Sequence, residues 1–214
     1  MSLQRFRIAL IGSRVLHKQA EYADDVQFMH KLCYRLAEIG VRFTSGLCEE
    51  GLDAIAQKEF SRALCDQKAS LNQFEVYVYD IRAVHKSTLP NRHLALPMNS
   101  RVKHELYRIA ENLHPAWANC DDYARKQHAR NIHQILGYHL DRPVNAVVTW
   151  CVTDKNGNPT GGTSTAIKLA KQHDIPVFNF YGVDRAEMLD KLNRFLRSTL
   201  LMPNQQQYIR NIYK

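Results

Sequence analysis

The sequence predicts a single Rossmann-like α/β domain whose mainly parallel sheet is flanked by helices. Residues 145–180 carry the clearest indication, because a strand, a glycine-rich loop, a helix and a second strand follow one another, as in the βαβ unit of a parallel sheet. Two strand–loop–helix units near the N-terminus repeat this order. We place the Rossmann-like domain at 1–184 and expect 185–214 to form a helix and a basic tail that packs on it or extends from it.

Composition and charge indicate a globular protein with an anionic partner. Of the 214 residues, 45% are hydrophobic and 23% are charged, which argues against a disordered chain. Lys and Arg exceed Asp and Glu by 29 to 21, and this net charge of +8 favours nucleic acid or a nucleotide over an acidic protein surface.

The cysteines and the hydropathy pattern indicate the compartment. The five cysteines form no CxxC pair, which is typical of reduced thiols in a cytoplasmic protein. The charged segment 1–7 leads into a strand, so we expect no signal peptide. No apolar run has membrane-spanning length, and we expect no membrane partner.

The first strand, predicted at 5–11, runs directly into Gly12, Ser13 and Arg14. A strand followed by this loop is a candidate phosphate site, because the guanidinium of Arg14 can pair with an anion. The alternative is a polar turn with a solvated arginine.

The loop after the second strand, residues 45–53, has the glycine spacing of a P-loop. Gly46 and Gly51 match GxxxxG, but Leu52 and Asp53 stand where the motif needs Lys and Ser or Thr. The loop is therefore not an ATPase loop.

Hydrophobic periodicity places the other elements. Helices are predicted at 22–36, 52–63, 101–113, 121–136 and 186–196, and further strands at 41–44, 74–79, 146–150 and 176–180. Residues 81–99 contain two prolines and no period, so we expect a long excursion over the strand ends. The helix at 121–136 carries a basic run that indicates either a surface facing nucleic acid or a solvated face, namely Arg125, Lys126, His128 and Arg130.

The loop that ends in Gly161 and Gly162 is a second candidate phosphate site. Such a turn presents backbone N–H groups and the positive end of a helix dipole, and Thr163, Ser164 and Thr165 add hydroxyl donors. The alternative is a tight turn in which Thr163 caps the helix. Parallel sheets bind ligands beyond their strand ends, which favours the phosphate site.

Motifs for metal or hydrolytic chemistry are missing. His104 and Glu105 begin like HExxH, but Arg108 occupies the place of the second histidine. The patterns GxSxG and GxGxxG are both missing, which argues against an α/β-hydrolase and an ordinary dinucleotide-binding site. We expect neither a metal nor a cofactor.

Taken together, the loops resemble those of the DprA/Smf proteins, which belong to the Rossmann-like SLOG superfamily, and especially of their short relatives from bacteriophages. The matches are IGSR, SG…GLD, GGTSTAIKLA and the Arg-Asn pair in ARNIHQILG, within about residues 5–180. The resemblance implies binding of single-stranded DNA, delivery to a recombinase and a cytoplasmic location, in the host if the protein is phage-encoded; a homodimer is left open. The implied DNA-facing residues are Ser13, Arg14, Ser45, Gly46, Arg130, Asn131, Gly161, Gly162 and Thr163.

The sequence also departs from the family pattern. The loop SGxARGxD is one residue longer here, with Glu49 and Glu50 where its arginine sits, and Ile132 replaces the second arginine of RNR. The phosphoribohydrolases of the same superfamily give an enzymatic alternative. Their motif PGGxGTxxE has a catalytic glutamate where this chain has Lys168, so a carboxylate would have to come from Glu49 or Glu50.

We therefore expect a DprA-like protein that binds single-stranded DNA or nucleotide phosphates without catalysis and acts in DNA recombination. The alternatives are a nucleotide N-glycosidase that uses Glu49 or Glu50, and a non-catalytic binder of a small, NAD-derived nucleotide signal.

Overall fold

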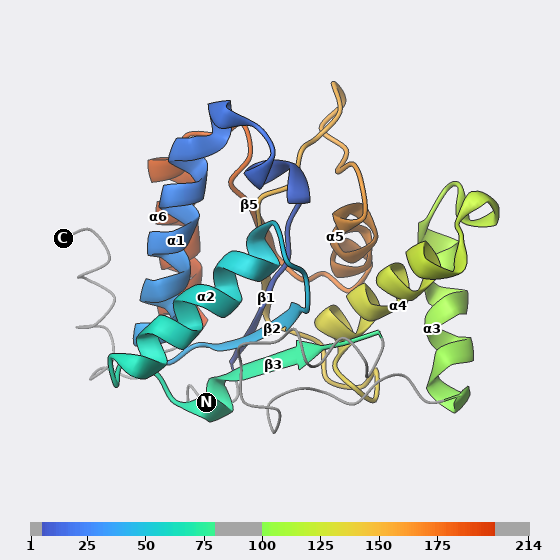
Figure 1. Ribbon diagram of the computed structural model, residues 1–214, viewed down its shortest axis with the longest axis horizontal. Helices are drawn as coiled ribbons and strands as arrows, with labels where there is room; N and C mark the ends of the chain where they lie inside the picture. The colour runs from blue at the N-terminus through green and yellow to red at the C-terminus, as the bar shows by residue number, and fades with distance from the viewer. Residues whose placement is uncertain (1–5, 80–99, 200–214) are drawn as a thin grey trace.

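The computed structural model describes residues 6–79 and 100–199, which form a parallel five-stranded sheet with helices on both faces (Figure 1). The strands pair in the order β3-β2-β1-β4-β5 and comprise β1 (Arg7–Leu10), β2 (Arg42–Gly46), β3 (Phe74–Tyr77), β4 (Ala146–Thr149) and β5 (Val177–Asn179). Strand order reverses between β1 and β4, which is where doubly wound sheets bind ligands. The Rossmann-like fold predicted from the sequence is confirmed.

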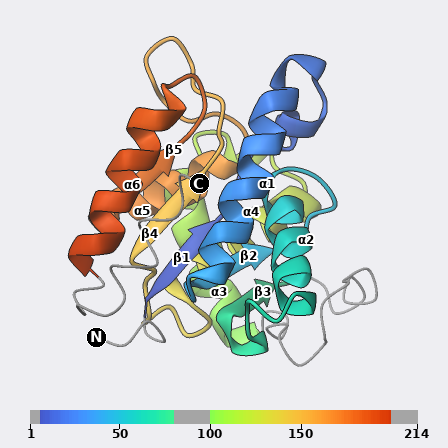
Figure 2. The same cartoon turned by 90° about the vertical axis from the view of Figure 1, so that its left-hand side faces the viewer.

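Helices α1 (Ala23–Glu38), α2 (Leu52–Cys65) and α6 (Arg185–Thr199) pack on one face of the sheet. Helices α3 (Ser100–Leu113), α4 (Asp122–Leu136) and α5 (Thr163–Gln172) pack on the other face. Two views at right angles show the two layers (Figures 1 and 2).

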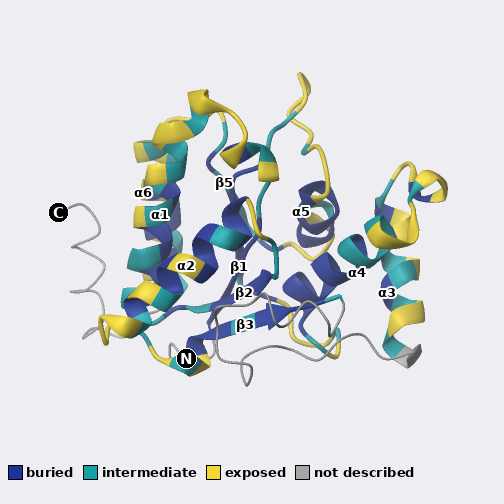
Figure 3. Ribbon diagram, viewed as in Figure 1, coloured by how far each residue is buried: buried dark blue, intermediate teal, exposed yellow. Residues whose placement is uncertain are grey.

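Alternate residues of the central strands fill the two cores. Ile8 and Leu10 face the core under α1, α2 and α6, whereas Ala9 and Ile11 face the core under α3, α4 and α5. A strand buried on both faces needs apolar side chains at every position, which explains the continuous run of β1. Figure 3 shows the sheet and the inner helix faces buried, with the loop at 154–158 fully exposed.

Every helix and strand expected within the described residues is present. The main shift is that Ser45 and Gly46 belong to strand β2 rather than to the following loop. Asp121 caps α4 through its side chain, which accepts a hydrogen bond from the Ala124 N–H, and Gly137 ends this helix with φ +80°. The excursion expected at 81–99 and the basic tail at 200–214 lie outside the described residues.

Helix α6 packs on the sheet through Leu189, Leu192 and Leu196. All five cysteines are unpaired, as the sequence predicts. None of the helices in the described parts of the chain is both long and apolar enough to span a bilayer.

Candidate phosphate-binding pocket

A pocket of about 1070 Å³ lies beyond the carboxyl ends of the central strands. Its walls come from the loops after β1, β2 and β4, from α2 and α4, and from Tyr79 just after β3. This is the ligand position expected for the strand order, since the loops after β1 and β4 flank the point where the order reverses. This volume is slightly above the usual range for small-molecule sites, about 300–1,000 Å³.

Most of the residues singled out from the sequence meet in this pocket. Its lining includes Gly12, Ser13, Arg14, Arg130, Asn131, Gly161, Gly162 and Thr163, together with the two glutamates Glu49 and Glu50. Ser45, Gly46 and Ser164 are not part of the lining. Four segments far apart in the sequence therefore converge on one space.

Arg130 is the central cation of the pocket and is only 4% exposed. Its Nη1 donates to Cys48 Sγ (3.2 Å) and its Nη2 donates to Asn131 Oδ1 (3.1 Å), while Nε has no hydrogen-bond partner. Burial raises the pKa of the Cys48 thiol, which the Arg130 charge opposes, so the thiol stays neutral near pH 7. In the described part of the chain, no carboxylate forms an ion pair with this guanidinium.

Gly46 makes room for Arg130. A Cβ added at Gly46 would lie 2.6 Å from Cζ and 2.7 Å from Nε of Arg130, so no larger residue fits without moving the guanidinium. The predicted role of Gly46 was direct contact with the anion. In the structure Gly46 does not line the pocket and instead lies against the Arg130 guanidinium, whose position depends on the space that the glycine leaves.

Asp53 ties the loops together beneath the pocket and is 2% exposed. Its Oδ1 accepts hydrogen bonds from the Gly46 N–H (2.8 Å), the Ser45 hydroxyl (3.3 Å) and Gln134 Nε2 (3.0 Å). Its Oδ2 accepts from the Gly12 N–H (3.4 Å). Ser45 is thus committed to this buried network, and Asp53 links the ends of β1 and β2 to helix α4.

The glycine loop after β4 presents its backbone to the pocket. Gly161 has φ +67°, the left-handed conformation that favours glycine, whereas Gly162 has φ −62° and is the N-cap of α5 without a side-chain cap. A Cβ at either position would have no atom within 4 Å. Asn131 Nδ2 donates to the Gly162 carbonyl (2.9 Å), which joins the loop to the residue that also contacts Arg130.

Ser13 and Arg14, in the loop after β1, also line the pocket. The Ser13 N–H donates to the Trp150 carbonyl (2.9 Å), and the Ser13 hydroxyl accepts from the Val15 N–H (3.2 Å), so this loop is anchored to the end of β4. Arg14 is exposed, and no described residue forms a hydrogen bond or an ion pair with it. The pocket wall therefore carries one exposed arginine and one buried arginine.

The basic run of α4 is neither one continuous nucleic-acid surface nor one solvated face. Arg125 lies over the Trp117 ring, Lys126 pairs with Asp122, and His128 is buried, so only Arg130 of the four lines the pocket. The pocket face of α4 is made by residues spaced four, three and one apart, Tyr123, Gln127, Arg130 and Asn131.

Two aromatic residues that sequence reasoning missed also line the pocket. The rings of Tyr79 and Tyr123 make an edge-to-face pair with centroids 5.5 Å apart. Tyr123 is 51% exposed, which is unusual for so large a side chain. Its helical spacing from Arg130, seven residues, was the signal that could have identified it.

The candidate catalytic glutamates lie at the rim. Glu49 and Glu50 are exposed, and Glu50 forms an ion pair with Lys18 (3.6 Å). Lys168, which stands in the place of the phosphoribohydrolase glutamate, donates to the Leu113 carbonyl (3.2 Å) and does not line the pocket. Among the described residues, the one group with the donors and spacing of a metal site is His114, Cys120 and His128, which lies outside this pocket.

Comparisons with known proteins give one match. No protein-family model matches the sequence, and no curated protein matches it significantly. A solved structure of DNA processing protein A from Helicobacter pylori, described for its single-stranded DNA binding mode, has 16% sequence identity and a TM-score of 0.44. The match covers 98% of this chain and 82% of that chain.

Proposed function

We propose that this protein binds single-stranded DNA without catalysis and that the pocket beyond β1, β2 and β4 holds the phosphates. One observation carries the proposal, namely the buried guanidinium of Arg130 on the pocket wall, whose hydrogen bonds go to Cys48 and Asn131 and which forms no ion pair with a carboxylate of the described residues. The carboxylate of Asp53 attracts this guanidinium from beyond ion-pair distance, and charge-assisted bonds to a bound anion would compensate the buried charge directly. Phosphate is the anion that suits the surrounding loops.

The surroundings of Arg130 support a phosphate ligand. The N-terminus of α5 adds the positive end of a helix dipole, and Gly161 and Gly162 leave the backbone open to close approach. Arg14 and Lys58 add exposed positive charge at the rim. The carboxylate of Asp53 already accepts four hydrogen bonds from groups within the protein.

The aromatic pair favours a single-stranded polymer over an isolated phosphate. Tyr123 lies seven residues before Arg130 on one helix face, which corresponds to about 10 Å along the axis. Unpaired bases stack on exposed aromatic rings, whereas paired bases in a duplex are covered by their neighbours. The DprA/Smf-like loop motifs point to the same ligand.

The alternative of N-glycosidase activity has weaker support. The position of the phosphoribohydrolase glutamate is occupied by Lys168, whose side chain reaches the end of α3. Of the two glutamates on the neighbouring loop, Glu50 is paired with Lys18 at the rim. We therefore expect no free base after incubation with nucleoside 5′-monophosphates. Base release that Glu49→Gln or Glu50→Gln stops would overturn the non-catalytic assignment.

Fluorescence anisotropy with a labelled oligothymidine tests the binding function. The matched variants are Arg130→Ala and Arg125→Ala, which remove one arginine each from the same helix on different sides. We expect Arg130→Ala to weaken binding by about 10- to 150-fold, the equivalent of a charge-assisted hydrogen bond of about 1.5–3 kcal/mol, and Arg125→Ala to have little effect. Circular dichroism checks that each variant is folded, because Arg130 is buried.

The salt dependence gives a second criterion. For a phosphate-bound single strand, log affinity falls linearly with log salt concentration, with a slope of about −0.7 per contacted phosphate, and Arg130→Ala should reduce this slope. Duplex DNA and 5′-mononucleotides serve as competitors. Equal loss in both arginine variants, or tight and salt-independent binding of one mononucleotide, would contradict the proposal.

A further inference from the structure

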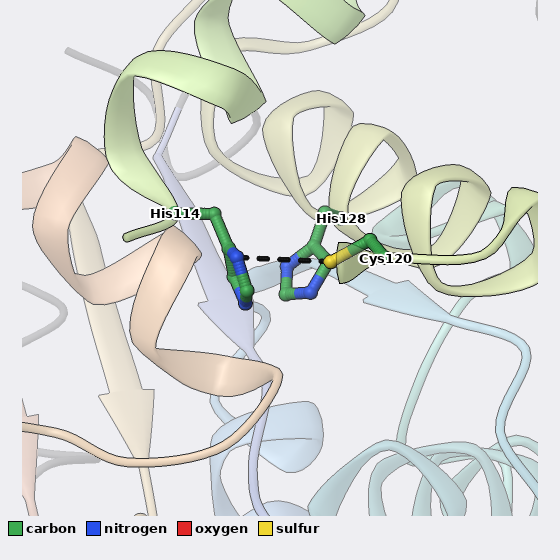
Figure 4. Close-up of side chains that lie close together, drawn as sticks. All are labelled: His114, Cys120 and His128. Atoms are coloured by element: carbon green, nitrogen blue, oxygen red, sulfur yellow. Dashed lines mark hydrogen bonds between the residues drawn. The ribbon is translucent and has the colours of Figure 1, made fainter. Parts of the chain in front are cut away.

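Three side chains with metal-binding donors converge at the junction of α3 and α4 (Figure 4). His114 follows the last residue of α3, Cys120 lies in the connection, and His128 lies within α4. Cys120 Sγ is 3.7 Å from His114 Nδ1, and the centroids of the two imidazole rings are 4.4 Å apart. Taking one donor atom from each residue, all three lie within 4.8 Å of one another.

The buried member of this group is already oriented by a further residue. His128 Nδ1 lies 2.7 Å from the Thr165 hydroxyl of α5, so its Nε2 is the nitrogen left for a ligand. Metal-bound histidines in proteins almost always hold their second nitrogen in a hydrogen bond of this kind, which fixes the ring and the tautomer. Burial lowers the pKa of His128 and of His114, so both rings are neutral near pH 7.

We propose that His114, Cys120 and His128 bind one zinc-like divalent cation, with water in the fourth position. One sulfur and two imidazole nitrogens are a ligand set that zinc accepts in proteins. Tetrahedral zinc places its sulfur and nitrogen ligands about 3.5 Å apart and its nitrogens about 3.3 Å apart. The Cys120–His114 distance already fits, and the other pairs need to close by at most about 1.5 Å, which rotation of the His114 ring and the Cys120 side chain supplies while His128 keeps its hydrogen bond to Thr165.

The charges around the cluster indicate how the cation would be bound. Lys168 and Arg130 both act on its imidazoles as nearby positive charges, and a thiolate at Cys120 would supply the compensating negative charge. Binding through sulfur therefore displaces the thiol proton. The aromatic ring of Trp117 lies beside His128, with centroids 6.3 Å apart, and forms an apolar wall.

Because of its position, a cation bound to the cluster would connect three helices. It would join the end of α3 to α4 two residues before Arg130, and Thr165 extends the same set of contacts to α5. A bound metal should therefore stabilise the layer of helices that carries the pocket. The metal site and the phosphate pocket are separate, so either can be tested without the other.

Titration of the chelator-treated protein with Co²⁺ tests the site by absorption spectroscopy. A thiolate ligand gives a charge-transfer band in the near ultraviolet, and tetrahedral Co²⁺ gives intense visible bands. We expect both in the wild type, loss of the charge-transfer band in Cys120→Ser, and loss of the tetrahedral bands in His114→Ala. Thr165→Val should weaken Co²⁺ affinity by about 10- to 100-fold, as loss of a residue that orients a metal-bound histidine does.

The double variant Cys65→Ser, His173→Ala is the matched control, because it removes one exposed cysteine and one exposed histidine elsewhere. It should keep the complete spectrum and the rise in the thermal unfolding midpoint that Zn²⁺ gives to the wild type. No thiolate band in the wild type, or a band that survives Cys120→Ser and disappears in the control, would overturn the proposal.

Discussion

Replacing Gly46 with alanine tests whether the position of the Arg130 guanidinium, and not its charge alone, sets the affinity for the ligand. The new Cβ would lie 2.6 Å from Cζ, 2.7 Å from Nε and 2.9 Å from Nη1. Ordinary contact begins at 3.4 Å, so the guanidinium must move by at least 0.8 Å, the difference between 3.4 and 2.6 Å. The Arg130 charge stays in the protein, but its distance from the phosphate changes.

The expected effects on affinity and on stability are of different size. A charge-assisted hydrogen bond contributes about 1.5–3 kcal/mol, and a displaced guanidinium loses part of it, so we expect about tenfold weaker binding of single-stranded DNA. Overfilling a packed site costs about 1–3 kcal/mol. We expect Gly46→Ala to lower the free energy of unfolding by about 1 kcal/mol, the lower end of this range, because the end of an arginine side chain can move.

Anisotropy titrations of the two single variants and the double variant Gly46→Ala, Arg130→Ala provide the assay. If alanine at 46 acts only by displacing the guanidinium, it has no further effect on affinity once the arginine is absent, and the two changes are not additive. Urea unfolding shows whether each protein is folded. Additive losses of affinity, or unchanged affinity in Gly46→Ala, would refute this account of Arg130.

Two further variants probe the loops. Gly162→Ala should raise the free energy of unfolding by about 0.4–1 kcal/mol, because alanine readily adopts the φ of −62° found there. The added Cβ should also hinder the approach of the ligand and so lower the affinity for DNA. Gly161→Ala should instead lower the free energy of unfolding, because alanine disfavours the φ of +67° at that position. Urea unfolding measures the stability of both variants, and anisotropy measures their affinity for DNA. Unchanged affinity in Gly162→Ala would mean that the ligand does not approach Gly162. Asp53→Asn leaves one oxygen for four donors, so we expect a loss of about 2–3 kcal/mol in urea unfolding, whereas a loss below about 0.5 kcal/mol would show that the network contributes little.

The order and type of the secondary-structure elements could be predicted because they depend on local patterns. The continuous apolar run of β1 indicates a strand covered on both faces, and spacings of three and four identify the helices. Strands that alternate with helices lead to a parallel sheet, and such a sheet gathers the loops after its strands at one edge. The sequence alone therefore predicts that Ser13 and Gly162, with their neighbours, lie at the same edge of the sheet.

The contacts within that edge could not be predicted, because they depend on how helices pack against a sheet. Nothing near Arg130 in the sequence indicates that it is buried, or that Gly46, more than eighty residues earlier, leaves the space for it. Ser45 and Gly46 form the last two residues of a buried strand, where the Ser45 hydroxyl and the Gly46 N–H both donate to Asp53.

The sequence by itself determined the Rossmann-like α/β fold, through hydrophobic periodicity and glycine positions, and its net charge predicts an anionic partner. Only the tertiary structure decided which cation lies inside the pocket and that Tyr79 and Tyr123 form an aromatic pair there. It also brought His114, Cys120 and His128 together across the end of a helix, a spacing that no local motif describes. Periodicity is a property of neighbouring residues, whereas a site forms when packing brings distant side chains within a few ångströms of one another.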